Sequence, residues 1–256
     1  MKTTTRADIF KIIKEKGAVR PAELAKKLGI TTQAVHRHLR TLTLEGSIET
    51  RGSSPYTEYV VVDSPDFNSA IEWLKGSNPR GLQDFICETR DIFAARLNRL
   101  ASLTKRGFSE ECLPLLISAT GEVGNNSFDH NLGHWRDAVG CWFEIVFTKN
   151  RVWVLIADQG QGVLSSLSRV AKDLSTDVLA LKKAFEEHIS GRAPENRGNG
   201  LKFVRNIIMG GPDRGIACRS GKGVVHYGEL GPDCSKILKG ISNNGVGTTT
   251  IITWEL

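Results

Sequence analysis

The stretch GEVGNNSFDHN, residues 121–131, follows the apolar run LPLLISAT and places polar side chains directly behind an expected helix core. On a helix, Glu122, Asn126 and Asp129 are spaced four and three residues apart and share one face, with His130 nearby. Two interpretations are open: a solvated helix face, or a metal and nucleotide site. A stripe of this kind, taken alone, is more often solvated, so the rest of the sequence has to decide.

The composition is that of an ordinary folded chain. Its 256 residues, 40% hydrophobic and 24% charged, are enough for two domains with a proper core in at least one. No apolar run approaches the roughly 20 residues that span a bilayer, and the start, MKTTTRADIF, lacks a signal-peptide core. The 5 cysteines are scattered and never form a CxxC pair. We therefore expect reduced thiols, a cytoplasmic location and no membrane partner.

Positive charge is concentrated near the N-terminus. Residues 1–62 carry 11 Lys and Arg against 6 Asp and Glu, so they hold +5 of the net charge of +6. A small basic segment on a near-neutral body indicates an anionic partner, with nucleic acid as the natural candidate. A lysine-rich solvated surface is the alternative.

The same segment has the pattern of a small DNA-binding unit. Residues 6–16 carry an apolar helical stripe, and Pro21 opens a second helix at its favoured first position. Thr31 or Thr32 can cap a third helix, TTQAVHRHLRTLTLEG, which has its own apolar stripe. Two β-prone runs, SIET and EYVV, follow around RGSSPYT. Helices and a hairpin of these lengths predict a winged helix-turn-helix over residues 1–63.

The run AELAKKLGITTQAVHRHLRTLTLEGSIET resembles the helix-turn-helix and wing of bacterial transcription regulators. In that family the third helix enters the major groove, so the resemblance implies double-stranded DNA as a partner. The residues it implies at the DNA are Thr32, Gln33, His36, Arg37 and Arg40, with Arg51 in the wing. A winged helix that contacts protein is the alternative. A homodimer would suit a palindromic site, but no residue demands one.

A mixed segment separates this head from the C-terminal domain. Residues 64–105 begin with Pro, Gly, Ser and Asn around a short helical piece, SAIEWLK, which marks a domain boundary. The run GLQDFICETRDIFAARLNRLASLT then predicts one helix about 20 residues long. We expect this helix to pack on the C-terminal domain or on its copy in a dimer.

Further polar or glycine-rich segments end regular elements of the C-terminal domain. The β-rich run RVWVLIA ends at Asp158, followed by Gly160 and Gly162. A buried aspartate there needs a donor, such as an adenine amino group, although an Asx-type turn would also serve. The loop GRAPENRGNG leads into LKFVRNII, whose first turn could present N–H groups to phosphates. GVGTTTIITWEL predicts a final strand that opens on Gly247 and Thr248.

In this order the segments resemble the GHKL, or Bergerat-fold, ATPases: DNA gyrase B subunits, MutL-type repair ATPases, heat-shock chaperones, histidine kinases and anti-sigma-factor kinases. ExxxN looks like their N box, DQGQG like the first glycine box, RGNGLKF like the second, and GVGT like the closing element. The resemblance covers roughly residues 110–256. It implies an α/β chain with a Bergerat-type α/β sandwich over residues 106–256, and ATP and Mg²⁺ as cofactors.

The resemblance also implies a role for each matching position. Glu122 would be the catalytic base, Asn126 would hold Mg²⁺, and Asp158 would accept a hydrogen bond from the adenine amino group, assisted by Thr248. The other implied ATP-binding positions are Asp129, Gly160, Gly162, Gly198, Gly200, Leu201 and Lys202. The first two of these glycines would floor the base pocket, and the second glycine box would close over the phosphates.

Two functions remain open. One is an ATP-binding, slowly ATP-hydrolysing transcription regulator, whose nucleotide state is coupled to DNA or partner binding through a lid at about 163–200. The other is an anti-sigma-type Ser/Thr kinase whose winged helix docks a partner protein, because Glu122 suits either reaction. Nucleotide held only as a structural ligand is a third alternative. The chain departs from gyrase-type boxes at Gln161, and it shows no histidine-kinase phosphorylation motif. We also expect no transducer domain after the ATPase domain, which argues against a gyrase- or MutL-like machine.

Overall fold

The computed structural model describes residues 6–44, 47–61, 65–76, 82–106, 108–131, 133–135, 138–148, 150–171, 173–187, 200–241 and 247–256. By its internal contacts the chain divides into two compact units. The first holds Met1–Asp66 with Ile145–Trp153, and the second holds Phe67–Glu144 with Val154–Leu256. The domain limits at residues 63 and 105 stay predictions. No helix within the described ranges is long and apolar enough to span a membrane.

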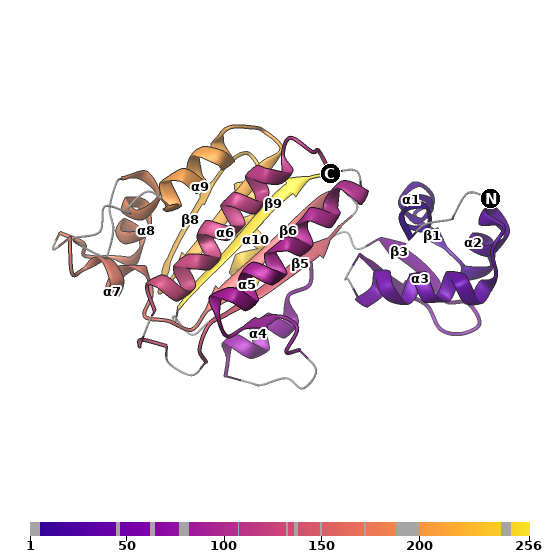
Figure 1. The fold of residues 1–256 in the computed structure, drawn as a ribbon, viewed down its shortest axis with the longest axis horizontal. Helices are drawn as coiled ribbons and strands as arrows, with labels where there is room; N and C mark the ends of the chain where they lie inside the picture. Colours follow the sequence, from indigo (N-terminus) through magenta and orange to yellow (C-terminus); the bar gives the residue numbers. More distant parts are fainter. Residues whose placement is uncertain are drawn as a thin grey trace. The chain divides into compact units, whose positions relative to one another are not determined.

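The N-terminal head is built from helices and a small antiparallel sheet (Figure 1). Its helices are α1 (Arg6–Lys16), α2 (Pro21–Leu28) and α3 (Thr32–Leu44). Its strands are β1 (Ala18–Val19), β2 (Ile48–Arg51) and β3 (Glu58–Val61), in the order β1-β3-β2. The predicted winged helix-turn-helix is confirmed, with β2 and β3 as the wing hairpin.

The helix ends in the head follow from single residues. Pro21 stands at the start of α2, and Gly29 ends it in the left-handed conformation with φ 66°, its N–H bonded to the carbonyl of Ala25. Thr31 caps α3, because its Oγ1 accepts from the N–H of Ala34 at 3.2 Å. Of the two threonines considered as caps, Thr31 therefore fills the role.

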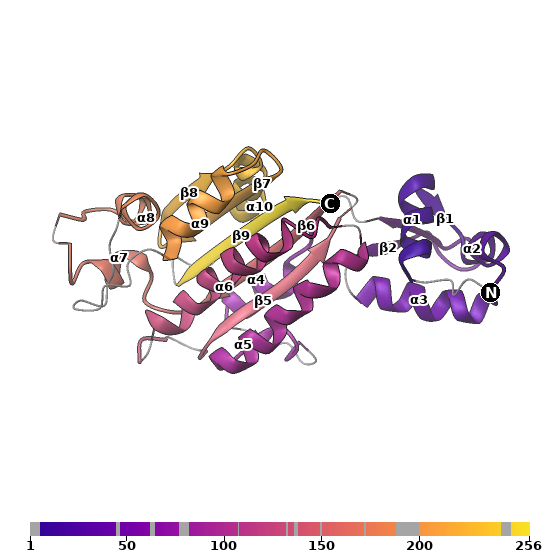
Figure 2. The same ribbon diagram turned by 45° about the horizontal axis from the view of Figure 1, so that its top comes forward.

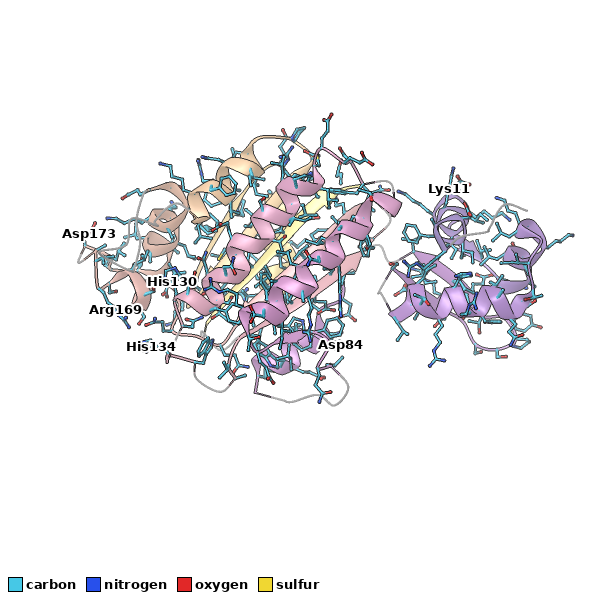
Figure 3. All side chains as sticks on the ribbon, viewed as in Figure 1. Lys11, Asp84, His130, His134, Arg169 and Asp173 are labelled. Atoms are coloured by element: carbon cyan, nitrogen blue, oxygen red, sulfur yellow. The ribbon has the colours of Figure 1, made fainter. Side chains whose placement is uncertain are left out.

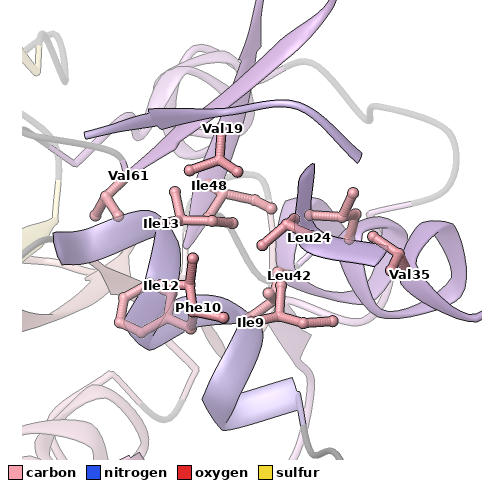
Figure 4. Packing of buried hydrophobic residues seen from close by; sticks show 11 residues of the cluster. Ile9, Phe10, Ile12, Ile13, Val19, Leu24, Val35, Leu42, Ile48 and Val61 are labelled. Carbon is pink, nitrogen blue, oxygen red and sulfur yellow. The ribbon is translucent and has the colours of Figure 1, made fainter. Parts of the chain in front are cut away.

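The helices and strands of the head share an apolar core (Figure 4). Its members come from all three helices and all three strands: Ile9, Phe10, Ile12, Ile13, Val19, Leu24, Val35, Leu39, Leu42, Ile48 and Val61. The stripe of α3 at Val35, Leu39 and Leu42 is turned inward. The opposite face of α3 is consequently left to the solvent.

A six-stranded sheet of order β4-β5-β6-β9-β7-β8 belongs to the second unit except for residues 145–153, where β5 ends and β6 begins, which are grouped with the first. The strands are β4 (Ile86–Cys87), β5 (Cys141–Phe147), β6 (Arg151–Asp158), β7 (Arg214–Ser220), β8 (Gly223–Tyr227) and β9 (Thr248–Glu255). The pairs β4–β5, β7–β8 and β7–β9 are antiparallel. Because β9 lies between β6 and β7, the last strand of the chain enters the middle of the sheet.

Helices cover both faces of this sheet. The helices of the second unit are α4 (Asn68–Leu74), α5 (Arg90–Leu97), the 3-10 helix η1 (Asn98–Arg106), α6 (Leu113–Asp129), α7 (Val163–Leu167), α8 (Asp177–Glu186), α9 (Gly200–Met209) and α10 (Gly231–Gly240). Helices α5, α6 and α9 lie side by side across one face, and α10 lies behind the other (Figures 1 and 2). The chain is thus a mixed α/β protein with an N-terminal winged helix.

The prediction of one helix of about 20 residues over 81–104 is wrong. Ile86 and Cys87 form β4 at the edge of the sheet, and α5 begins only at Arg90, where Thr89 Oγ1 accepts from the N–H of Ile92 at 3.3 Å. The pattern of apolar residues does not show where a cap begins a helix. The prediction therefore combined the apolar residues of the strand and of the helix into a single helix. Residues 67–106 therefore contribute a strand as well as helices to the second unit.

Candidate functional site

A pocket lies between α6 and the sheet in the second unit. The residues that line it are Val123, Asn126, Ser127, His130, Asn131, Ile156, Asp158, Gly162, Val163, Ser166, Leu167, Ala184, Gly200, Leu201, Cys218, Thr248 and Thr250. The α6 members recur every three or four residues, and those of β6 and β9 recur every second residue. One side of a helix and one face of a sheet therefore make the two main walls.

Asp158 stands at the end of β6 and is buried, with 4% of its surface exposed. Its Oδ1 accepts from the N–H of Gly160 at 2.9 Å and of Thr248 at 3.2 Å. Its Oδ2 accepts from the hydroxyl of Ser127 at 3.2 Å. Burial raises the pKa of Asp158 to about 6, against the opposing effect of these hydrogen bonds. The Asx-type turn considered for Asp158 does form, and the same carboxylate also ties together β6, β9 and α6.

The glycines around Asp158 stand where the chain leaves no space for a side chain. A Cβ atom on Gly160 would overlap the side-chain amide of Asn131, and one on Gly247 would overlap the carbonyl of Asp158. Gly162 has φ 80°, a conformation that favours glycine. The DQGQG turn is therefore pressed against the end of α6 and the start of β9.

Polar residues at the end of α6 complete this corner of the pocket, and sequence reasoning assigned them no part in it. Asn131 donates from Nδ2 to the carbonyl of Ser127 at 3.0 Å and accepts at Oδ1 from the N–H of Gln161 at 3.2 Å. His130 Nδ1 lies 3.1 Å from the hydroxyl of Ser166, and burial lowers the pKa of His130. These contacts make His130 a hydrogen-bonded residue at the end of α6. Ser127 and Asn131 are four residues apart, and this helical spacing could have indicated from the sequence that the two side chains lie on one face.

Most of the ATP-binding positions implied by the resemblance meet at this pocket. Asn126, Asp158, Gly162, Gly200, Leu201 and Thr248 all line it. Gly160 lies directly behind Asp158, where its N–H binds the carboxylate. Gly198 and its neighbours Arg197 and Asn199 in the second glycine box lie outside the described residues.

The other implied positions lie around the pocket instead of lining it. Glu122 faces the start of α9, because a Cβ on Gly200 would come 2.7 Å from its Oε2. Asp129 forms an ion pair with Arg90 of α5, which binds α5 to the end of α6. Lys202 is half-buried in the first turn of α9. The stripe of Glu122, Asn126 and Asp129 is thus divided among three different surroundings.

The exposed face of α3 carries the residues expected at DNA. Thr32, Gln33, His36, Arg37 and Arg40 are all exposed, between the buried positions of the same helix. Arg51 ends β2 in the wing and forms an exposed ion pair with Glu49 at 3.3 Å. The head therefore presents one cationic, polar helix face of the kind that enters a major groove.

Comparison with known proteins identifies the head. Residues 2–49 match the family of winged helix-turn-helix DNA-binding domains. An uncharacterized protein of Methanocaldococcus jannaschii is 42% identical over 55 residues, which are 22% of this chain and 20% of that protein. The matched part thus spans about one fifth of the relative's length. The N-terminal part of this chain is therefore a winged helix-turn-helix DNA-binding domain.

Proposed function

We propose that this chain is an ATP-binding transcription regulator: its head binds double-stranded DNA, and the pocket beside α6 binds Mg-ATP as in Bergerat-fold ATPases. The single observation that carries the nucleotide part is the setting of Asp158. This buried carboxylate lines the pocket, and two backbone N–H groups hold its Oδ1. Its Oδ2 accepts from Ser127 and has a further lone pair to offer to a ligand donor. The exocyclic amino group of adenine is such a donor.

The pocket also suits the shape of a purine. Ile156, Leu167 and Cys218 give it apolar surface for a flat ring, and Gly162 adds no side chain. A guanine would bring a carbonyl oxygen instead of an amino group to the carboxylate, so the arrangement favours adenine. The position of the pocket, between α6 and the face of the sheet that α6 covers, is the feature of the fold that supports the assignment to the Bergerat class.

The side of the pocket near α9 fits phosphates and a metal ion. Asn126 supplies an amide oxygen, a ligand type that suits Mg²⁺. Helix α9 begins at Gly200, so its first N–H groups and its dipole favour an anion there. Bound Mg²⁺ would neutralise phosphate charge. Glu122 reaches the same end of α9, where a base would orient and deprotonate an attacking hydroxyl or water.

The test of the nucleotide site is calorimetric titration of Mg-ATP into the full chain and into Asp158→Asn. The two N–H groups on Oδ1 will fix the amide oxygen of the asparagine there, so its NH₂ group will replace Oδ2. A donor will then meet the adenine amino donor, and we expect affinity to fall at least tenfold. Asp84→Asn is the matched control, because Asp84 is exposed and lies away from His130 in Figure 3. Equal affinity in wild type and Asp158→Asn, or no ATP binding by folded wild type, would refute the proposal.

The same preparation distinguishes hydrolysis from phosphate transfer. With γ-labelled ATP, a regulator that hydrolyses ATP releases free phosphate, and release should be lost in Glu122→Gln. An anti-sigma-type kinase would instead place the label on a serine or threonine of a partner protein. Binding without either product would leave nucleotide as a structural ligand.

We also propose that nucleotide binding changes the affinity of the head for DNA. The support is the occurrence of both sites in one chain, together with the ion pair of Arg90 and Asp129, which joins the end of the pocket helix to α5. Affinity for a DNA duplex, measured with and without Mg-ATP, should differ in wild type and not in Asp158→Asn. Identical affinities in wild type would eliminate the coupling while leaving both binding sites standing.

A further inference from the structure

Two of the cysteines stand directly opposite each other at the edge of the large sheet. Cys87 of β4 and Cys141 of β5 are partners in the antiparallel register, and both are buried. Opposed residues of antiparallel strands have Cα atoms about 4.5–5.5 Å apart, which lies inside the range of about 4.4–6.8 Å that a disulfide spans. A side-chain hydrogen bond already joins the two thiol groups. Little movement is needed to bring the sulfur atoms into bonding contact.

The guanidinium group of Arg96 lies beside this pair of cysteines. Arg96 of α5 donates from Nη1 to Cys87 Sγ at 3.5 Å and to the carbonyl of Ile86 at 2.6 Å, and from Nη2 to the carbonyl of Gln83 at 2.8 Å. The guanidinium is therefore held in place by the backbone around β4. A fixed positive charge next to a thiol favours its thiolate, which is the nucleophilic form of cysteine.

The surrounding charges distinguish the two sulfur atoms. The hydrogen bond from Cys141, the charge of Arg96 and the more distant Arg99 lower the pKa of Cys87, against the effect of burial. The hydrogen bond with Cys87, burial and the charge of Asp158 raise the pKa of Cys141 well above its usual range. Cys87 is thus the sulfur of the pair that loses its proton more readily, and Cys141 is the one that retains it.

We propose that Cys87 and Cys141 are a redox-sensitive pair that hydroperoxides convert to a reversible disulfide. The Cys87 thiolate attacks a peroxide oxygen, so that an S–O bond forms, the O–O bond breaks and hydroxide (or an alcohol) leaves. Cys141 sulfur then attacks the sulfenic sulfur, the S–S bond forms, and the S–O oxygen leaves with the Cys141 proton as water. Two thiols lose two electrons in total, and the peroxide gains them.

Because β4 lies at the edge of the sheet, local opening can expose the buried thiols to a small oxidant. Strand β4 has only two residues and pairs on one side with β5, so local opening there breaks few hydrogen bonds. A cysteine on a strand inside the sheet has a different setting. Cys218 illustrates the contrast, because burial raises its pKa to about 12.

Closure of the disulfide would tie β4 to β5 across the segment that contains α5, η1 and α6. Helix α6 forms one wall of the pocket, so the disulfide would restrain the segment that carries this wall. The redox chemistry stands without the nucleotide proposal, since it depends only on Cys87, Cys141 and Arg96.

The direct test is stepwise oxidation of the full chain with hydrogen peroxide, followed by thiol titration in denaturant and peptide mass spectrometry. Of 5 titratable thiols, two should disappear together. A Cys87–Cys141 peptide pair should appear, lighter by two hydrogens, and dithiothreitol should restore all the thiols. Retention of every thiol, or a disulfide between other cysteines, would overturn the proposal.

Variants separate the roles of the two sulfurs and of Arg96. In Cys141→Ser the sulfenic acid on Cys87 has no resolving thiol, so dimedone should label Cys87. Cys112→Ser is the matched control and should oxidise as wild type. In Arg96→Gln the pH profile of oxidation should move upward, with a rate at pH 7 about threefold lower for each unit that the pKa rises. Arg96→Lys, which keeps the cation, should recover most of the rate. Should Cys141→Ser fail to fold, mass spectrometry of the wild type still decides.

Discussion

The ring of Phe93 in α5 occupies the space that a side chain on Gly124 of α6 would fill. Phe93 is 1% exposed, and its ring also meets Phe143 of β5 edge-on at 5.2 Å between centroids. Gly124 thus lets α5 approach α6 closely enough for one phenyl ring to reach the sheet. Since α6 carries the pocket residues on an adjacent face, this contact sets the position of the pocket wall.

Gly124→Ala should therefore destabilise the protein. The added methyl overlaps the Phe93 ring, and overpacking of a closed core costs about 1–3 kcal/mol, which exceeds the roughly 1 kcal/mol that alanine gains over glycine in a helix. The control is Gly121→Ala on the same helix, whose Cβ would lie 3.3 Å from a flexible Leu97 methyl. Urea denaturation should show lower stability for Gly124→Ala and equal or higher stability for Gly121→Ala. Equal effects of the two changes would contradict the packing argument.

Asp158 predicts an unusual dependence of stability on pH. Its folded pKa, about 6, lies above the ordinary value of 3.8, so between these values the folded protein holds a proton that the unfolded chain has released. Unfolding free energy from this group is therefore greatest below pH 4 and is lost as pH rises through 6. The full loss is about 3 kcal/mol at about 1.4 kcal/mol per pKa unit.

Asp158→Asn removes this dependence while keeping the size of the side chain. Relative to wild type, the variant should gain stability between pH 4.5 and pH 7.5 in urea titrations. Asp173→Asn is the control of opposite sign, because the hydrogen bond from Lys183 lowers the pKa of Asp173. For that variant, the stability relative to wild type should fall as pH rises through the region below about pH 4, and it should stay constant between pH 4.5 and pH 7.5. A flat difference for Asp158→Asn would mean that the carboxylate is not desolvated as the fold implies.

Much of the fold follows from the sequence because its longer elements have a clear period. The apolar stripe of α3 was sufficient to predict a helix, and the run that forms β6 was sufficient to predict a strand. The two-residue strands β1 and β4 were missed, since two residues have no period. They exist because a neighbouring strand supplies their hydrogen bonds.

The pocket was foreseen less completely than the elements that make it. Asp158 ends one apolar strand and Thr248 begins another, and a glycine lies within two residues of each. Both residues could therefore be picked out from the sequence. Ser127 and Asn131 carry no such mark, and their contacts depend on how α6 lies against the DQGQG turn. The ion pair of Asp129 with Arg90 likewise depends on how α5 packs against α6. The spacing of residues within 121–131 gives no information about that packing.

The DQGQG turn yields a prediction about ligand binding. In Gly160→Ala the new methyl overlaps the Asn131 side chain, which would displace the N–H that binds Asp158. We expect Mg-ATP affinity to fall at least tenfold and stability by about 1–3 kcal/mol. Gly240→Ala is the control, since its Cβ would have nothing within 4 Å. Wild-type affinity in a folded Gly160→Ala protein would show that the Asp158 setting is not needed for the ligand.

The head yields a prediction that separates contact with DNA from general charge. Arg37 and Arg40 are exposed on α3, whereas Lys11 of α1 is labelled on the opposite side of the head from α3 in Figure 3. If each arginine neutralises one phosphate, Arg37→Ala and Arg40→Ala should each lower the slope of log affinity against log salt by about 0.9. Lys11→Ala removes the same charge and should leave the slope unchanged. Fluorescence anisotropy with a labelled duplex at several salt concentrations measures all three. Equal slope changes in the three variants would indicate attraction by net charge alone, and α3 would lose its assignment as the helix in the major groove.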